Sequence, residues 1–184
     1  MLTEFPTASI HGRFQILHLD HLDYFQRAAD RYGRLYIGLT GLRHDLVGGA
    51  GRRSPAANPL TYWERVEMWR RVLLELGHHV DDHLIGPFPI EAPIFLGDFV
   101  PKDCICATTV REPWNEEKVR LLERLGYQVD DLKCSTEKTV SSTMIRSMIA
   151  DGSLDWKDLV PRSVADFLVS IDLRSRLEGC SSER

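Results

Sequence analysis

The chain lacks the features that would assign it to a membrane, to nucleic acid or to a secreted scaffold. Among its 184 residues no apolar run approaches the roughly 20 that cross a bilayer. A formal net charge of −4 gives no positive field for a phosphodiester backbone. The four cysteines have spacings of neither a zinc ribbon nor a small disulfide framework. These absences predict a cytoplasmic protein with reduced thiols, and neither nucleic acid nor a membrane as partner.

The composition that is present suits one globular domain. With 43% hydrophobic and 27% charged residues, residues 1–184 can bury a core without the support of disulfides or metal ions. We expect about 142–178 to form a C-terminal helical part of this domain. Extended and helical segments alternate, which predicts an α/β, Rossmann-like three-layer fold with a central parallel sheet. Strands are expected at 7–13, 35–40, 84–85, 103–108 and 127–132, and helices at 19–32, 61–77, 118–125, 142–150 and from 161 onward.

A long stretch rich in Gly, Arg and Ser separates the second strand from the second helix. It covers residues 41–58, and loops of that length in compact domains are usually functional. We expect it to act as a lid. After it, Thr61 and Glu64 have the spacing of a capping box, which predicts a helix start there.

Two histidines stand where the first strand leads into the first helix. His18 and His21 are three residues apart, so on a helical turn they share a face. The amides and macrodipole of a helix start favour an anion, and Gly12 allows a ligand to approach the backbone closely. The segment therefore suggests a phosphate site. Two surface histidines of an amphipathic helix would give the same pattern.

A second polar segment opens the helix expected at 142–150. It offers two hydroxyls, Ser142 and Thr143, and the guanidinium of Arg146, which together with free amides are the groups that bind a triphosphate. Taken alone, these residues would also suit a helix N-cap and a solvated arginine. The two segments together favour a nucleotide site.

These segments resemble the signatures of the nucleotidyltransferase superfamily, H-x-G-H near the N-terminus and I-S-x-T-x-I-R near the C-terminus. Over about residues 8–171 the chain is most similar to archaeal-type nicotinamide mononucleotide adenylyltransferases. Further matches are Gly12 to Gln15 with G-R-F-Q, Asn58 to Arg65 with N-P-F-T-x-x-E-R, and Asp158 to Val164 with D-L-V-P-x-S-V. The resemblance implies transfer of an adenylyl group from ATP to nicotinamide mononucleotide or a related phosphorylated molecule, with Mg²⁺ as cofactor and release of pyrophosphate, in a chain that forms homo-oligomers.

The resemblance also assigns roles to residues. The catalytic groups, which hold the phosphates and stabilise developing charge, would be His18, His21, Arg13 and Arg146. Nucleotide-binding residues would be Gly12, Phe14, Gln15, Ser142, Thr143 and Thr108. Acceptor-binding residues would be Phe95 and Pro89. No side chain need act as a nucleophile, because the phosphate of the acceptor attacks the α-phosphate.

The chain departs from the family at Asp20, where the signature has glycine. A carboxylate about 5 Å from a phosphate charge at an effective dielectric near 20 would repel it by about 3 kcal/mol. Asp20 could instead cap the first helix, contact a metal ion or hydrogen-bond a sugar hydroxyl. Its role stays open at this stage.

Substrate recognition is altered as well. Residues 87–95 align with the loop that binds the acceptor in the family. Phe95 replaces the family's tryptophan that stacks on nicotinamide, and the family's asparagine is missing from this loop. Residues 107–110 replace a T-G-N type turn near the nucleotide base, and Trp114 nearby could stack on a base or be structural. Two alternatives therefore stand beside adenylyl transfer. One is a cytidylyltransferase that uses CTP and a small phosphorylated or phosphonate metabolite, and the other is a sensor that binds nucleotide without turnover.

Overall fold

The structure is a computed structural model that describes residues 4–42, 54–79, 81–109, 113–133 and 140–181. The chain divides into two compact units. Unit 1 comprises Met1–Arg13, Asp23–Leu42 and Asp81–Lys138, and unit 2 comprises Phe14–Leu22, Arg43–Val80 and Thr139–Arg184.

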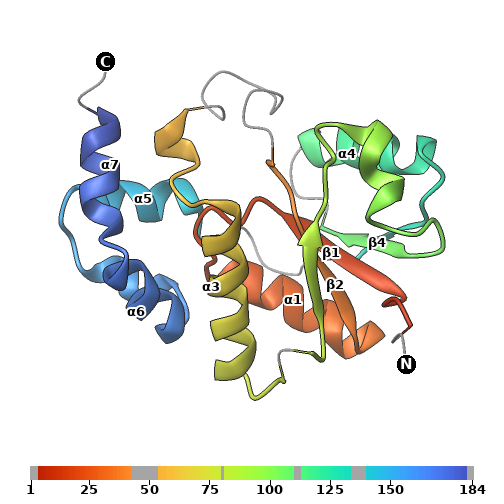
Figure 1. The fold of residues 1–184 in the computed structure, drawn as a ribbon, viewed down its shortest axis with the longest axis horizontal. Helices are drawn as coiled ribbons and strands as arrows, with labels where there is room; N and C mark the ends of the chain where they lie inside the picture. Colours follow the sequence, from red (N-terminus) through yellow and green to blue (C-terminus); the bar gives the residue numbers. More distant parts are fainter. Residues whose placement is uncertain (1–3, 43–53, 80, 110–112, 134–139, 182–184) are drawn as a thin grey trace. The chain divides into compact units, whose positions relative to one another are not determined.

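Unit 1 contains a five-stranded parallel sheet in the order β3-β2-β1-β4-β5 (Figure 1). The strands are β1 (Ala8–Gly12), β2 (Leu35–Leu39), β3 (Leu84–Pro87), β4 (Ile105–Thr108) and β5 (Val129–Asp131). The order changes direction between β1 and β4. In open parallel sheets this is where ligands bind, at the carboxyl ends of the strands.

Helices cover both faces of this sheet, as the alternation of the sequence predicts (Figure 1). They are α1 (Leu19–Tyr32), whose first turn is counted in unit 2, and α4 (Pro113–Arg124), and η3 (Pro93–Asp98) adds a 3-10 turn. Leu122 of α4 packs in a buried cluster with Cys104 and Cys106, so the two thiols lie in the core as expected of reduced cysteines. Burial raises the pKa of Cys104 to about 12.

Unit 2 is helical. It contains η2 (Pro55–Ala57), α3 (Tyr62–Glu75), α5 (Ser142–Ala150), η4 (Asp155–Leu159), α6 (Arg162–Ser170) and α7 (Leu173–Ser181). The capping box at the start of α3 is confirmed: Thr61 N donates to Glu64 Oε2 at 2.8 Å and Glu64 N to Thr61 Oγ1 at 3.2 Å. The Rossmann-like fold with a helical C-terminal part agrees with the sequence prediction, to which the structure adds α7.

Some sequence predictions fall on residues that are not described. Most of the expected lid, residues 43–53, lies outside the described residues. In the described part of the chain, no helix is long and apolar enough to cross a membrane. The organisation of residues 1–184 as one domain stays a prediction.

Candidate functional site

The loop between β1 and α1 has an unusual backbone. Phe14 and Ile16 have φ angles of 46° and 112°, a left-handed region that side chains with a Cβ rarely adopt. Phe14 is buried, with its ring edge-on against Trp69 of α3 at 5.0 Å between centroids. Such a conformation persists only where surrounding contacts determine it, and here those contacts come from three segments of unit 2.

Gln15 ties this loop to the segment before α3. Its Nε2 donates to Leu60 O at 3.0 Å, and Leu60 N donates to its Oε1 at 3.0 Å. Both ends of the buried side-chain amide therefore pair with one residue's backbone. This contact gives Gln15 a positioning role, and its predicted contact with nucleotide stays a prediction.

Helix α5 holds the same loop from the other end of the chain. Arg146 donates from Nη1 to Gln15 O and from Nη2 to Thr143 Oγ1, both at 3.0 Å, and Ser142 Oγ donates to Ile16 O at 2.9 Å. Arg146 is 8% exposed, so its positive charge is placed in a largely dehydrated setting, where it acts more strongly on an anion than in water. The cap of α5 is Ser141, whose hydroxyl accepts from Met144 N at 3.2 Å.

The two histidines meet at the start of α1. The carbonyl of His18 accepts from His21 N at 2.9 Å and from Leu22 N at 3.1 Å, which begins the helix. Their rings stack with centroids 3.8 Å apart and an interplanar angle of 28°, and His21 also meets the edge of Phe14 at 5.0 Å. The helical turn thus places both imidazoles together, as the spacing predicts.

Asp20 lies in the first turn of α1. Its Oδ2 accepts from Val140 N at 3.4 Å, so the carboxylate connects the helix start to the segment that leads into α5. A negative side chain is favourable in the first turn of a helix, where the backbone amides concentrate positive charge. This contact gives Asp20 a structural role in addition to those that the sequence left open.

Six of the predicted residues belong to unit 1. Gly12 ends β1 and Arg13 follows it, while Thr108 ends β4 and is buried. On the other side of the sheet order, Pro89 is buried after β3 and Phe95 of η3 is 55% exposed. Trp114 is in α4, but its side chain lies outside the described part. The other predicted residues belong to unit 2 and are Phe14, Gln15, His18, Asp20, His21, Ser142, Thr143 and Arg146.

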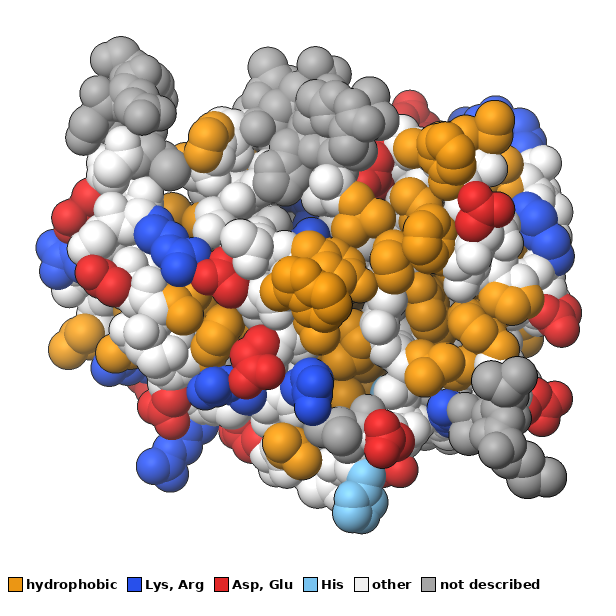
Figure 2. All heavy atoms as spheres, viewed as in Figure 1, with side chains coloured by type: hydrophobic (Ala, Val, Ile, Leu, Met, Phe, Trp, Pro, Cys, Tyr) orange, Lys and Arg blue, Asp and Glu red, His pale blue; other side chains and the backbone are white. Residues whose placement is uncertain are grey.

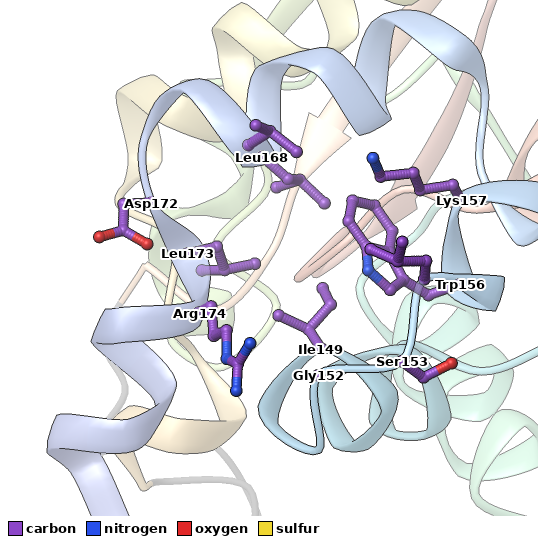
Figure 3. Close-up of a pocket in the computed structure, with 11 residues that line it drawn as sticks. Ile149, Gly152, Ser153, Trp156, Lys157, Leu168, Asp172, Leu173 and Arg174 are labelled. Atoms are coloured by element: carbon purple, nitrogen blue, oxygen red, sulfur yellow. The ribbon is translucent and has the colours of Figure 1, made fainter.

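Figure 2 shows hydrophobic side chains gathered on the face that it draws. In unit 1 the exposed hydrophobic residues of η3 and just after it are Ile94, Phe95 and Phe99. In unit 2 a cavity of about 280 Å³ lies among α5, η4, α6 and α7 (Figure 3). Trp156, Leu168 and Ile149 point into it, and the predicted site residues do not line it.

A further buried polar group, His11, is not indicated by any sequence motif. His11 of β1 is buried, and neither of its ring nitrogens has a hydrogen-bond partner among the described residues. A histidine inside an expected strand gives no local signal of such a role, because its surroundings depend on strands and a helix far away in the sequence.

The fold defines a class, an α/β protein with an open parallel sheet of the kind that binds ligands at the carboxyl ends of its strands. No family model matches the chain. It is 33% identical over 177 residues to a phosphonoformate cytidylyltransferase of Streptomyces viridochromogenes, with 94% of this chain and 96% of the relative covered. It is 30% identical over 172 residues to a nicotinamide-nucleotide adenylyltransferase of Saccharolobus solfataricus, with 90% and 91% covered.

A solved structure has the same fold. The chain matches a bifunctional NMN adenylyltransferase/ADP ribose pyrophosphatase from Francisella tularensis with a TM-score of 0.64 at 16% identity, over 93% of this chain and 53% of that one. The chain thus spans about half the length of that protein. The first two relatives match nearly the whole chain over nearly their whole length. The chain therefore belongs to the nucleotidyltransferase superfamily of nicotinamide-nucleotide adenylyltransferases and phosphonoformate cytidylyltransferase. The predicted enzyme class, nucleotidyl transfer with release of pyrophosphate, is confirmed.

Proposed function

We propose that this nucleotidyltransferase moves a cytidylyl group from CTP to an oxygen of a small phosphonate or phosphate. The observation that carries the proposal is the cluster in unit 2, in which the stacked His18 and His21 begin α1 and the buried Arg146 holds the loop before it. Two imidazoles and a guanidinium beside a helix start suit a triphosphate.

The reaction needs positioning and charge stabilisation. An oxygen of the acceptor attacks the α-phosphorus and forms a new P–O bond, while the bond between the α-phosphorus and the oxygen that bridges to the β-phosphate breaks. Pyrophosphate leaves with that electron pair. His18, His21 and Arg146 would donate hydrogen bonds to the phosphate oxygens as charge develops on them. The catalytic role that the resemblance gives to Arg13 stays a prediction.

Magnesium fits this site as a companion of the triphosphate. Among described residues, no group of three or more His, Cys, Asp or Glu could enclose a metal ion. Mg²⁺ commonly binds through one or two carboxylates together with substrate phosphates, so Asp20 would be its protein ligand. When bound, the ion neutralises charge on the phosphates. Its presence would also offset the repulsion between Asp20 and the triphosphate.

The choice of CTP is supported by the relative that is a phosphonoformate cytidylyltransferase, which matches over 96% of its length. It is also supported by this chain's departures from the adenylyltransferase pattern. Residues 107–110 lack the T-G-N type turn, and residues 87–95 lack the asparagine and tryptophan expected at the acceptor.

Adenylyl transfer from ATP to nicotinamide mononucleotide is the second candidate. Nicotinamide-nucleotide adenylyltransferases of Sulfolobus acidocaldarius and Saccharolobus solfataricus are 28% and 30% identical to the chain. The exposed aromatic ring of Phe95 could stack on a pyridine ring. A cytoplasmic location and a homo-oligomeric state stay predictions, and the second can be tested by light scattering.

A matrix of pyrophosphate-release assays tests the proposal. Purified protein with Mg²⁺ is given CTP or ATP, each with phosphonoformate, methylphosphonate, nicotinamide mononucleotide or nicotinate mononucleotide. We expect the highest kcat/KM for CTP with a phosphonate. A preference for ATP with a pyridine mononucleotide would establish the second candidate. No release from any pair, together with measurable triphosphate binding, would favour the sensor alternative. The His21→Ala variant shows whether the release belongs to this chain.

A further inference from the structure

The carboxyl end of β1 in unit 1 holds an unexplained polar cluster, formed by His11, Thr108 and Lys118. His11 is 4% exposed and Thr108 is 1% exposed. Both nitrogens of the imidazole and the hydroxyl oxygen of Thr108 are without hydrogen-bond partners among the residues that the structure describes. Buried polar groups are normally paired, because an unpaired one has lost its hydrogen bonds to water without replacement. The unpaired atoms of His11 and Thr108 therefore indicate a place where a polar ligand binds.

Strand register places these groups on one face of the sheet. Ser9 pairs with Cys106 across the parallel ladder between β1 and β4. His11 and Thr108 each follow two residues later, and alternate residues of a strand point to the same face. Beyond this pair the Tyr24 hydroxyl lies between the strands, since it donates to Ala107 O and accepts from His11 N at 3.4 Å.

Helix α4 brings a positive charge to this face. Burial lowers the pKa of His11 well below 6.5, and the nearby charge of Lys118 lowers it further. Burial also lowers the pKa of Lys118 to about 8, with Cys106 acting in the opposite direction. The histidine is therefore neutral at pH 7 and the lysine is mostly protonated. The cluster offers an ammonium, a hydroxyl and an imidazole N–H.

The ring of His11 is fixed in place by packing. It stacks on Phe88 with centroids 4.2 Å apart and an interplanar angle of 5°. The strand neighbour of His11 on the other side is Gly38, where an added Cβ would lie 2.7 Å from Phe88. Glycine at 38 thus lets Phe88 lie against the sheet and support the imidazole. A fixed donor binds a ligand without a large loss of side-chain entropy.

We propose that His11, Thr108 and Lys118 form a specificity site for a carboxylate of the acceptor. This inference rests on the proposed function. A carboxylate accepts several hydrogen bonds and carries the charge that an ammonium complements, whereas a nucleotide base carries none. The cluster lies at the carboxyl ends of β1 and β4, where the sheet order changes direction. The substrate class is therefore a small phosphonate or phosphate that bears a carboxylate.

Phosphonoformate and methylphosphonate make a matched pair of probes, because the carboxylate of the first is a methyl group in the second. Charge-assisted hydrogen bonds are worth about 1.5–3 kcal/mol. In Lys118→Met we expect the KM for phosphonoformate to rise about thirtyfold, while the KM for methylphosphonate changes by less than about twofold. Lys118→Arg should recover part of the loss. Lys102→Met, which removes an exposed lysine of the same unit, is the control.

Equal effects of Lys118→Met on both probes would overturn the proposal, and so would no effect on either. A binding assay keeps the test independent of turnover. The protein is labelled at histidine, and the NMR signal of His11 is identified from its loss in His11→Phe. Phosphonoformate should shift this signal in the wild type, and methylphosphonate should not. A shift caused by CTP alone would assign the cluster to the nucleotide and overturn the proposal.

The two assays separate the failure of this inference from that of the proposed function. If no acceptor gives pyrophosphate but phosphonoformate shifts the His11 signal, the function is wrong and the carboxylate site stands. If phosphonoformate is turned over with CTP but Lys118→Met leaves its KM unchanged, the function stands and the carboxylate site is wrong. Thermal unfolding of each variant shows that it is folded before either result is used.

Discussion

The histidine pair of unit 2 and the single buried histidine of unit 1 differ in where their neighbours come from in the sequence. His18 and His21 of unit 2 are three residues apart on one helical turn, and their rings stack at 3.8 Å between centroids. His11 of unit 1 stands alone in β1, and its neighbours Thr108 and Lys118 come from β4 and α4. The pairing of His18 with His21 follows from local helix geometry, whereas the surroundings of His11 follow from strand order. The difference indicates that a pair on one helical turn can be predicted from spacing, whereas the proposed specificity site depends on contacts that only the structure gives.

The largest expected effect tests the pair in unit 2. His21→Ala removes a donor to the phosphates in the transition state, and turnover should fall at least about a hundredfold with little change in triphosphate affinity. Steady-state pyrophosphate release and equilibrium binding measure the two quantities. His79→Ala, in an exposed connection of the same unit, should leave both unchanged. Unchanged turnover in His21→Ala would remove the pair from the mechanism.

A smaller effect is expected at Arg146, where charge and geometry can be separated. Arg146→Lys keeps the charge but cannot bond both Gln15 O and Thr143 Oγ1 as the planar guanidinium does. Turnover should fall about tenfold to thirtyfold, and the melting temperature should also fall, since a buried bond to the loop is lost. Arg162→Lys, which changes an arginine with an exposed side chain in α6, is the control. Wild-type turnover in Arg146→Lys would mean that only the charge matters.

Asp20 should show a moderate effect that depends on magnesium. Asp20→Asn keeps an oxygen that can accept from Val140 N but removes the negative charge. If the carboxylate holds Mg²⁺ with the triphosphate, the Mg²⁺ concentration for half-maximal rate should rise about tenfold. Rates measured across a magnesium series test this. Faster transfer at every magnesium concentration would instead identify Asp20 as a repulsive group.

The smallest effect concerns stability and belongs to unit 1. The pKa of His11 is lower in the folded chain than the unfolded value near 6.5, so between these values the unfolded chain binds more protons. The free energy of unfolding should therefore fall as the pH drops below about 6.5, by about 1.4 kcal/mol per unit of pKa difference. His11→Phe keeps a ring against Phe88 and should reduce this loss. Urea unfolding at pH 7 and pH 5 measures it, and an equal loss in both proteins would contradict the assignment.

The sequence predicted the elements whose signals are local. The bounds of α1 and α5 agree with the predicted 19–32 and 142–150, because apolar spacing and an N-cap are encoded in neighbouring residues. The sequence did not predict that the Gln15 side chain would hydrogen-bond the backbone of Leu60. It also did not predict that Phe88 would lie over Gly38 and support His11. These contacts depend on which distant segments pack together, and no local pattern specifies that.

The loop at Phe14 to Leu17 has a consequence for when the enzyme becomes active. Left-handed conformations at Phe14 and Ile16 cost roughly 1–3 kcal/mol each, and the bonds that offset this cost include one from Arg146 to Gln15, 131 residues away in the sequence. During synthesis β1 and α1 leave the ribosome long before α5 does. The loop can therefore take its final shape only once α5 is available, so a chain cut short before residue 146 should bind triphosphate poorly even if its sheet has formed.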